Sequence, residues 1–443
     1  MEPRGHKLYV FLAEPRMTLD VFTGNDKAME IKAQLQKYGI VQNIMHLVNA
    51  HSLSVVHAKQ EPNKAKGVDG EDKESYGKNL LKNIQNLLGR MIGFQYKPQP
   101  VRRTYIPKLN GKLRPLGIPS YEDRLVQGAM AEILNEVYEP EFLNCSYGFR
   151  PKRRCHDAIK FINNIVMFNH VNWILEADIK GFFDHVNHNK LMEMLGERIK
   201  DSSFLRYVMR FLTAGVMESG KYLDSTEGTP QGGLISPVLA NVYLHYVLDT
   251  WIEKTIKPMM KGIVHYVRYA DDFVILLERE DEAMQMMQML KERLAEYSLE
   301  VAEDKTRILP FGPKAKEKEE FDFLGFTFYN TKTRKGWYRV GIKTCMKKLK
   351  AKRQLIKQWI KFNMHEDTEE LLAALNLKYK GHCQYYGVNG NFPMLAKFKR
   401  YLMYITYKTL RRRSQKGKIS WEKFLELWEQ FIHKPRICVQ IWN

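Results

Sequence analysis

The fold of this chain is set by the run His265-Tyr-Val-Arg-Tyr-Ala-Asp-Asp-Phe-Val-Ile-Leu-Leu277. Two consecutive acids, Asp271 and Asp272, stand in it between β-branched and aromatic residues. The apolar flanks predict two short strands, and the acids mark the turn between them. A carboxylate in such apolar surroundings must be paired or must hold a metal. The run therefore predicts a β-hairpin that presents carboxylates at its tip.

A third acid, Asp178, stands in a matching context 93 residues before Asp271. It lies in Trp173-Ile-Leu-Glu-Ala-Asp-Ile-Lys-Gly-Phe-Phe-Asp184, which is typical of a strand that ends near its acid. Two strands that each deliver an acid predict a site for two divalent cations, about 3.5–4 Å apart, that clamp both oxygens of an in-line phosphoryl displacement. Carboxylate oxygens suit Mg²⁺. The alternative is that the acid pair merely caps a surface hairpin.

Charge is concentrated at one end of the chain. The net charge is +20 over 443 residues, and residues 331–443 hold 26 Lys and Arg against 7 Asp and Glu. The rest of the chain is therefore close to neutral. A basic terminal region with interleaved Trp and Tyr favours a nucleic-acid partner over a merely solvated basic face.

Several protein classes are not expected. The five cysteines are scattered, so neither a disulfide framework nor a Cys-type zinc site is predicted. The apolar run 8–13 is too short for a signal peptide or a membrane span. With 44% hydrophobic residues, the chain is expected to be a folded, soluble, intracellular protein of two to four structural units.

Periodicity and turn residues predict a mixed architecture. Asn110-Gly111 predicts a hairpin turn, and residues 173–329 mix strands and helices, which is typical of an α+β layer with helices on one face of an antiparallel sheet. No strand is expected beyond the first few residues after Arg339. The expected helices lie at 123–138, 156–166, 238–248, 346–362, 392–410 and 421–431.

Three further groups are chemical candidates. The glycines of Gly228-Thr-Pro-Gln-Gly-Gly233 allow the backbone to approach a ligand, and Gln231 can hydrogen-bond a base or sugar. The equal alternative is an ordinary loop that leads into a helix. Lys108 and Arg114 stand on opposite arms of the predicted hairpin, where both can reach a triphosphate or can be ordinary surface charges. Phe183 can pack on a sugar and clash with a 2′-hydroxyl, or can belong to the core.

The order of the motifs is more informative than any one of them. It resembles the reverse transcriptase domain of group II intron-encoded proteins over roughly residues 60–330, starting near Gly67-Val-Asp-Gly70. Single matches to such motifs are common, whereas six in order are very rare. The motifs are Lys108…Arg114, Ser146-Tyr-Gly-Phe-Arg-Pro151, Asp178-Ile-Lys-Gly-Phe-Phe-Asp184, Thr229-Pro-Gln-Gly-Gly-Leu-Ile-Ser-Pro237, Tyr269-Ala-Asp-Asp272 and Phe323-Leu-Gly-Phe326.

The resemblance implies an α+β right-hand polymerase fold with fingers, palm and thumb. Residues 1–95 would form an N-terminal extension, and residues 96–330 the fingers and a palm with an antiparallel sheet. Residues 331–443 would form an all-helical basic thumb, or maturase domain.

The resemblance also assigns roles to residues. Asp178, Asp271 and Asp272 would be the catalytic acids and, with the Ile179 carbonyl, would hold two Mg²⁺ ions, for which Mn²⁺ can substitute. We expect Asp271, rather than Asp272, to contact both ions. The remaining assignments are Lys108, Arg114, Phe183 and Gln231 to the nucleotide, Leu324 and Gly325 to the primer grip, and Arg150, Arg411, Arg412 and Arg413 to template or other RNA.

The function that the resemblance implies is RNA-directed DNA synthesis together with intron RNA binding and splicing (maturase) activity. The expected partners are an RNA template, intron RNA, a DNA primer and dNTPs. A cytoplasmic protein of prokaryotic type, able to associate with the nucleoid, is expected. Many relatives carry an HNH endonuclease with Cys pairs, and this sequence has no such pattern, so target cleavage is not expected. The alternatives are an RNA-binding splicing cofactor and a domesticated relative in host defence or repair.

Overall fold

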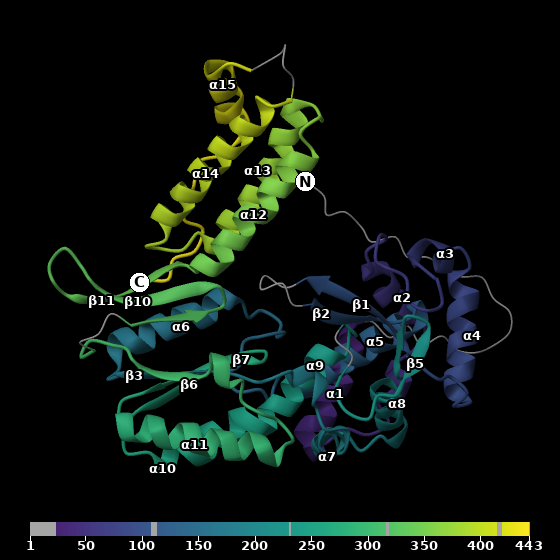
Figure 1. The fold of residues 1–443 in the computed structure, drawn as a ribbon. Coiled ribbons are helices and arrows are strands. Elements are labelled where there is room, and N and C mark those ends of the chain that lie inside the picture. The colour runs from purple at the N-terminus through teal and green to yellow at the C-terminus, as the bar shows by residue number, and fades with distance from the viewer. Residues whose placement is uncertain (1–23, 108–112, 230–231, 316–318, 414–418, 443) are drawn as a thin grey trace, which may run out of the picture.

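A computed structural model describes residues 24–107, 113–229, 232–315, 319–413 and 419–442. Figure 1 shows a lower body of two sheets and their helices, from which a bundle of helices rises on one side. A third, small sheet lies at the foot of this bundle, so that the bundle stands above the lower body.

The central sheet contains the hairpin predicted from the opening run. Its strand order is β6-β7-β3-β8, and every neighbouring pair is antiparallel. β-branched and aromatic residues fill these strands because they pack well on a pleated surface. The strands are β3 (Trp173–Asp178), β6 (Val264–Tyr269), β7 (Asp272–Leu277) and β8 (Arg307–Pro310).

Both faces of the central sheet are covered, so the expectation of helices on one face only was wrong. Leu175, Ile275 and Leu277 pack with the helices α7, α8, α9 and α11 in the larger core. Ile174 and Leu276 point the other way, toward α6 and the small sheet. Because strand side chains alternate, both faces can be apolar in these strands. The bounds are α6 (Cys155–Phe168), α7 (His188–Arg198), α8 (Ser202–Leu212), α9 (Ser236–Leu244), α10 (Lys257–Met259) and α11 (Glu280–Glu296).

A second sheet, with strand order β2-β1-β4-β5, lies among the N-terminal helices. The β1–β2 hairpin has the expected antiparallel register, in which Arg103 faces Gly117, while its turn Asn110-Gly111 lies outside the described residues. The strands are β1 (Val101–Pro107), β2 (Leu113–Ile118), β4 (Val216–Glu218) and β5 (Lys221–Leu223). The helices are α1 (Gly24–Tyr38), α2 (Ala50–Lys59), α3 (Lys73–Gly77), α4 (Leu80–Ile92) and α5 (Tyr121–Tyr138).

The small sheet, β11-β10-β9, corrects the expectation of an all-helical region from residue 331. Its strands are β9 (Glu320–Phe323), β10 (Phe326–Lys332) and β11 (Tyr338–Thr344), so the helices begin only at Met346. The three expected helices are confirmed, and the structure adds α13. The bundle comprises α12 (Met346–Phe362), α13 (Thr368–Tyr386), α14 (Phe392–Leu410) and α15 (Trp421–Phe431).

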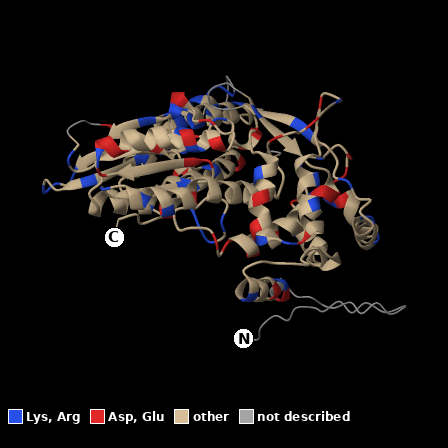
Figure 2. Cartoon of the chain, turned by 90° about the horizontal axis from the view of Figure 1, so that it is seen from below, with Lys and Arg blue, Asp and Glu red and all other residues tan. Residues whose placement is uncertain are grey.

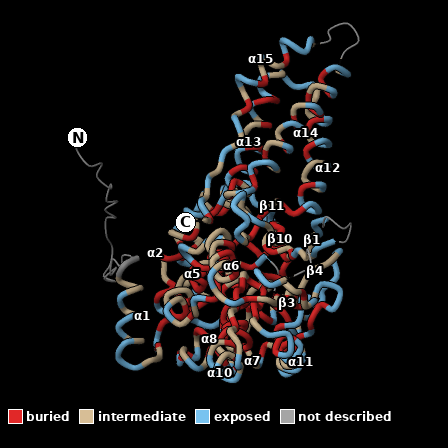
Figure 3. The backbone as a smooth tube through the Cα atoms, turned by 90° about the vertical axis from the view of Figure 1, so that its left-hand side faces the viewer, coloured by how far each residue is buried: buried red, intermediate tan, exposed pale blue. Residues whose placement is uncertain are grey.

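Burial follows this division. The lower body holds most of the buried backbone in Figure 3, whereas exposed stretches outline the bundle, whose narrow core centres on Tyr379, Phe398 and Trp428. Seen from below, acidic and basic positions are interspersed over the lower helices (Figure 2), which agrees with the near-neutral charge of that part of the sequence. Among the described residues, no helix has the length and apolar character needed to cross a membrane.

Candidate active site

Two of the three predicted acids face each other across neighbouring strands. Asp178 ends β3 and Asp272 begins β7, and the antiparallel register places them directly opposite one another. Directly opposed side chains share a face, so the two carboxylates point to the same side of the sheet. Ile174, four residues before Asp178 on that face, packs against the α6 core. The acids therefore emerge at the end of the sheet face that α6 covers further along.

The third acid, Asp271, lies in the two-residue turn between β6 and β7. In a regular strand, Asp271 and Asp272 would point to opposite faces. The turn begins instead with Ala270 at φ +58°, a left-handed backbone conformation that residues other than glycine rarely adopt. This reversal brings both acids to the tip of the hairpin, as the sequence predicted.

Backbone contacts hold this turn from the side. The Tyr147 nitrogen donates to the Arg268 carbonyl, and the Arg268 nitrogen donates to the Cys145 carbonyl, both at 2.8 Å. The next residue along, Gly148, lies so close to the turn that a Cβ on it would collide with the Ala270 nitrogen. Only glycine allows this approach. The Ser-Tyr-Gly-Phe-Arg-Pro motif is thus a support for the acids.

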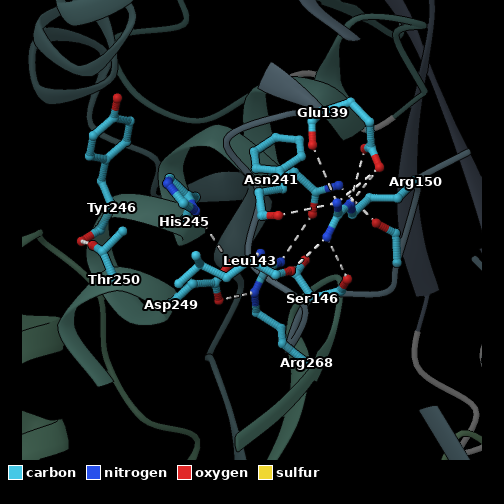
Figure 4. Close-up of polar contacts among 12 residues, drawn as sticks. Glu139, Leu143, Ser146, Arg150, Asn241, His245, Tyr246, Asp249, Thr250 and Arg268 are labelled. Carbon is cyan, nitrogen blue, oxygen red and sulfur yellow. Dashed lines mark hydrogen bonds and ion pairs between the residues drawn. The ribbon is translucent and has the colours of Figure 1, made fainter. Parts of the chain in front are cut away.

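A buried polar network clamps the same turn from within (Figure 4). The Arg268 guanidinium donates to the Ala270 carbonyl at 3.0 Å, to Asp249 Oδ1 at 2.7 Å and to Asn241 Oδ1 at 3.0 Å. Asn241 Nδ2 in turn donates to the Gly148 carbonyl at 2.8 Å. The side chains of Arg268 and Asp249 are both 0% exposed, and a fork-shaped pair of this kind fixes geometry as well as charge.

The pKa values of two of the acids, Asp271 and Asp272, are raised. Burial, with repulsion from Asp178 and then from Asp271, raises the pKa of Asp272 to about 7. Burial and repulsion from Asp178 also raise the pKa of Asp271, whereas the charges of Arg114 and Lys305 oppose that rise. Like charges held together in a poorly solvated place favour the neutral form unless cations join them.

One cation already stands at the site. The Lys305 ammonium forms an ion pair with Asp178 Oδ2, and this contact raises the pKa of Lys305. Beside it, Arg307 Nε pairs with Glu176 Oε2 at 2.9 Å on the same face of β3. An ammonium on a carboxylate marks the position as one that favours positive charge.

The chain also offers a backbone oxygen here. The Asp178 carbonyl accepts from the Ala302 nitrogen at 2.8 Å, on the side of β3 away from β7. Backbone groups alternate along an extended chain, so the Ile179 carbonyl turns to the opposite side, toward β7 and its acids. Three carboxylates and this oxygen form an all-oxygen donor set that fits Mg²⁺ or Mn²⁺. Among the described residues, however, no group of three or more Asp, Glu, His or Cys side chains has an arrangement that could hold a metal ion as it stands.

The predicted nucleotide residues are placed in part. Arg114 is exposed on β2 and acts electrostatically on Asp271, so the two lie in one neighbourhood. Phe183 is half-buried and lines a cleft of about 510 Å³ between the β1–β2 hairpin and the loop that ends at Thr229. Lys108 and Gln231 lie outside the described residues.

The predicted primer-grip residues form a second tight turn. Leu324 and Gly325 have φ of +50° and +78° and join β9 to β10. Tyr385 Oη donates to the Leu324 carbonyl at 2.8 Å, and the Cys345 nitrogen donates to the Gly325 carbonyl at 2.9 Å. The turn is thereby fixed to the foot of the helical bundle.

The predicted RNA-contacting arginines differ in what they can reach. Arg150 is only 6% exposed, and its guanidinium binds Glu139 Oε1 at 2.9 Å and the Leu143 carbonyl at 2.7 Å. This side chain therefore braces its own loop, and a contact between Arg150 and the template stays a prediction. Arg411 and Arg412 are exposed after α14, while Arg413 donates to the His365 carbonyl at 2.8 Å.

Sequence reasoning missed two residues of the site. Arg268 stands inside the apolar run that revealed the acids, and a charge in a buried strand requires a partner just as an acid does. That signal was present in the sequence, although its partner Asp249 was not identifiable. Lys305 carried no comparable signal, because it follows Asp304 in an ordinary charged stretch.

Comparison with known proteins bears on what this arrangement does. A family model described as "Reverse transcriptase (RNA-dependent DNA polymerase)" matches residues 106–328, which include all three acids. The chain belongs to the reverse transcriptase family. It is 30% identical to the group II intron-encoded protein LtrA of Lactococcus lactis subsp. cremoris, over 80% of this chain and 71% of the relative.

Two other relatives extend the likeness. This reverse transcriptase is 34% identical to the protein YkfC of Escherichia coli K12, over 62% of this chain and 78% of the relative. It is 30% identical to nuclear intron maturase 4, mitochondrial, of Arabidopsis thaliana, over 29% of this chain and 16% of the relative. The family model and these relatives make the chain an RNA-directed DNA polymerase of the group II intron type.

Proposed function

We propose that this reverse transcriptase extends a DNA primer on an RNA template by metal-assisted transfer of nucleotides from dNTPs. Asp178, Asp271, Asp272 and the Ile179 carbonyl would hold two Mg²⁺ ions. Bound there, the ions would lower the pKa of the primer 3′-hydroxyl and stabilise the charge that develops as pyrophosphate leaves. The observation that carries this proposal is the placement of Asp178 opposite Asp272 with Asp271 in the adjoining turn, where burial and the charge of Asp178 raise the pKa values of Asp271 and Asp272.

Residues around the acids would position the nucleotide. Arg114 is exposed near Asp271, where its planar guanidinium can bind two phosphate oxygens at once. Phe183 stands at the wall of the cleft, where its ring would face the sugar and exclude a 2′-hydroxyl. Lys108 and Gln231 are proposed to contact the triphosphate and the base or sugar. Phosphoryl transfer requires mainly such positioning and charge stabilisation.

The parts of the molecule would then match the palm, fingers and thumb of a polymerase. The central sheet is the proposed palm, the β1–β2 hairpin and its surrounding helices the fingers, and the helical bundle the thumb. The Leu324-Gly325 turn, which joins β9 to β10 and contacts Tyr385 of the bundle, is proposed to support the primer strand.

The experiment that tests this proposal is extension of oligo(dT) on poly(rA) with dTTP and Mg²⁺. Wild-type protein should extend the primer, and Asp271→Ala should reduce the rate by at least about a thousandfold, since the acid is proposed to contact both ions. Binding of the primer–template, measured by fluorescence anisotropy, should change by less than a few-fold. The exposed α11 acid variant Glu292→Ala should behave as wild type in both assays.

Either of two results would contradict the assignment. If Asp271→Ala lost binding and extension together, the acid would have a structural role. If it extended primers at the wild-type rate, the site would lie elsewhere.

A second activity, binding of structured intron RNA as a splicing cofactor, is favoured by one observation. Residues 331–443 carry 26 Lys and Arg against 7 Asp and Glu, and Arg411 and Arg412 are exposed there. Such a surface binds phosphates, so affinity should fall steeply with salt. Substituting both arginines by Gln should weaken binding of a group II intron RNA and flatten its salt dependence. An unchanged salt slope would remove these two residues from the interface.

A further inference from the structure

A loop beside the acid-bearing turn presents an exposed aromatic ring. Phe149 is 50% exposed and has φ +57°, a strained conformation for a bulky residue. Its neighbour Gly148 packs on the backbone of Ala270, next to Asp271. Phe149 therefore directly follows Gly148, the residue that supports the acid-bearing turn. The strained backbone here exposes an apolar side chain to solvent, so it does not improve packing in the core. Strained backbone conformations of this kind cluster at functional sites.

The loop is held in this conformation by contacts on both sides of Phe149. On one side, Asn241 binds the Gly148 carbonyl at 2.8 Å. On the other side, the buried Arg150 guanidinium binds the Ser146 carbonyl at 2.9 Å and the Glu139 carboxylate at 2.9 Å. The ring is consequently presented by a rigid support, which lowers the entropy lost when a partner binds.

Cations follow the ring along the loop. Lys152 and Arg154 are exposed, and the Arg153 guanidinium lies 5.5 Å from the centre of the Tyr147 ring. An aromatic face with neighbouring cations is the combination that binds single-stranded nucleic acid, because bases stack on the ring while phosphates meet the charges.

A cavity of about 660 Å³ lies beside Phe149, among α1, α2 and α5. Its walls combine the apolar surfaces of Phe149 and Pro151 with amide and imidazole groups. Such walls can accept the flat face and the polar edge of a nucleobase. The amide and imidazole groups belong to Asn49, His51 and Asn135. The wall also holds charged side chains, namely Lys27, Lys59, Glu132 and Glu136, of which Glu132 forms ion pairs with both lysines.

We propose that Phe149 stacks on an unpaired base of the RNA template, just ahead of the base being copied, and that the adjoining cavity receives it. A paired base hides both its faces in the duplex stack, so only an unpaired base can offer a face to Phe149. The bases of the primer are paired near Asp271, so an unpaired base beside this turn belongs to the template. This inference rests on the proposed polymerase function, because only a polymerase would bring a template strand past this turn.

The test compares binding of two RNA template–DNA primer duplexes, one blunt and one with three unpaired template nucleotides, by fluorescence anisotropy. Wild-type protein should prefer the second duplex. Phe149→Ala should lose at least about fivefold in affinity for it, the effect of removing about 1 kcal/mol of stacking, with no change for the blunt duplex. Phe149→Trp should retain the preference. The matched control is Phe168→Ala, which removes another exposed ring, at the far end of α6.

Phe149→Gly separates the ring from the strain. Glycine adopts φ +57° without penalty, so this variant should keep the fold while losing the ring. It should bind the overhang as weakly as Phe149→Ala, and thermal unfolding should confirm that it is folded. A 2-aminopurine at the first unpaired template position should be quenched by wild type and by Phe168→Ala, and not by Phe149→Gly.

Two outcomes would overturn the inference. One is a wild-type protein that binds both duplexes equally, and the other is a Phe149 variant that loses the same affinity for both. Primer extension by the wild type is measured in parallel. If extension occurs and either outcome is found, the stacking site fails alone, whereas an absence of extension by folded wild-type protein defeats the polymerase proposal itself.

Discussion

The β6–β7 turn and the β9–β10 turn each reverse the chain with two residues, Ala270-Asp271 and Leu324-Gly325. In the second turn both residues have positive φ and one is glycine, so local sequence goes far toward stabilising the geometry. In the first turn only Ala270 has positive φ, and no glycine is present.

The difference teaches where tertiary structure has to impose a conformation. The first turn carries an acid at its tip, and its shape depends on the close approach of Gly148 and on the Arg268–Asp249 pair. The second turn needs less of this, because Gly325 favours its geometry, and the contacts from Tyr385 and the backbone of Cys345 add to that. The turn that carries the acids has no glycine to relieve its positive φ, so contacts from the surrounding structure must stabilise the strained backbone.

The largest effect should come from breaking the clamp of the first turn. Arg268→Ala leaves the Asp249 carboxylate buried without its partner, which should lower the free energy of unfolding by about 3–5 kcal/mol. Denaturant unfolding measures this change. As a control, Arg307→Ala removes a half-exposed partner of Glu176 and should lower the free energy of unfolding by less than about 1 kcal/mol. Similar losses in the free energy of unfolding in both variants would show that the buried Arg268–Asp249 pair contributes no more to stability than an exposed ion pair.

Exchanging the residue types of the two turns should give unequal effects. Gly325→Ala places a Cβ 2.9 Å from Tyr386 Oη at φ +78°, so we expect a loss of about 1–3 kcal/mol in the free energy of unfolding. Ala270→Gly removes strain while adding freedom to the unfolded chain, and these effects should cancel to within about 1 kcal/mol. Thermal and denaturant unfolding of the two variants provide the comparison, and equal losses would contradict it.

The first turn should also make metal binding depend on pH. Because the pKa of Asp272 is raised to about 7, the metal-free site holds a proton below that pH, and Mg²⁺ must displace it. The Mg²⁺ concentration needed for half-maximal extension should fall by up to about tenfold per pH unit as pH rises toward 7, and level off above it. Stabilisation of the fold by Mg²⁺ should follow the same curve. A midpoint that is constant between pH 6 and 8 would contradict this pKa.

The smallest effect on stability should follow the loss of Lys305. Its side chain is 61% exposed, so the ion pair with Asp178 is well screened by solvent. Lys305→Ala should therefore change the free energy of unfolding by less than about 1 kcal/mol. Denaturant unfolding at low and at high salt is the measurement. A loss as large as that expected for Arg268→Ala would mean that the exposed side of the acid site is as tightly coupled to the fold as its buried side.

Much of the site was predictable because it lies in patterns that need no long-range information. The acid hairpin, the strand that ends at Asp178 and the helices α12, α14 and α15 each follow from local periodicity and turn residues. The short strands β4 and β5 were not foreseen, since three residues carry too little pattern.

The remaining differences come from partners that are distant in sequence. The covering of both faces of the central sheet depends on α6 and the small sheet meeting it in space. The burial of Arg150 depends on Glu139 and on carbonyl groups of the preceding loop, which no spacing rule reveals. The family resemblance assigned Arg150 to the template, whereas the contacts by which Arg150 braces its own loop are visible only in the fold.

The strand order of the central sheet also has a consequence for synthesis of the protein itself. β3 pairs only with β7 and β8, which end about 100 and 130 residues later in the chain. At about 5–20 residues per second, the ribosome needs roughly 7–25 s after completing β3 to supply both neighbours. During this interval β3, which ends at Asp178, is an apolar strand without its neighbours in the sheet, because Asp271, Asp272 and the rest of β7 have not yet been synthesised. The active site can therefore form only after β8 has been made, and until then β3 depends on shielding by other means.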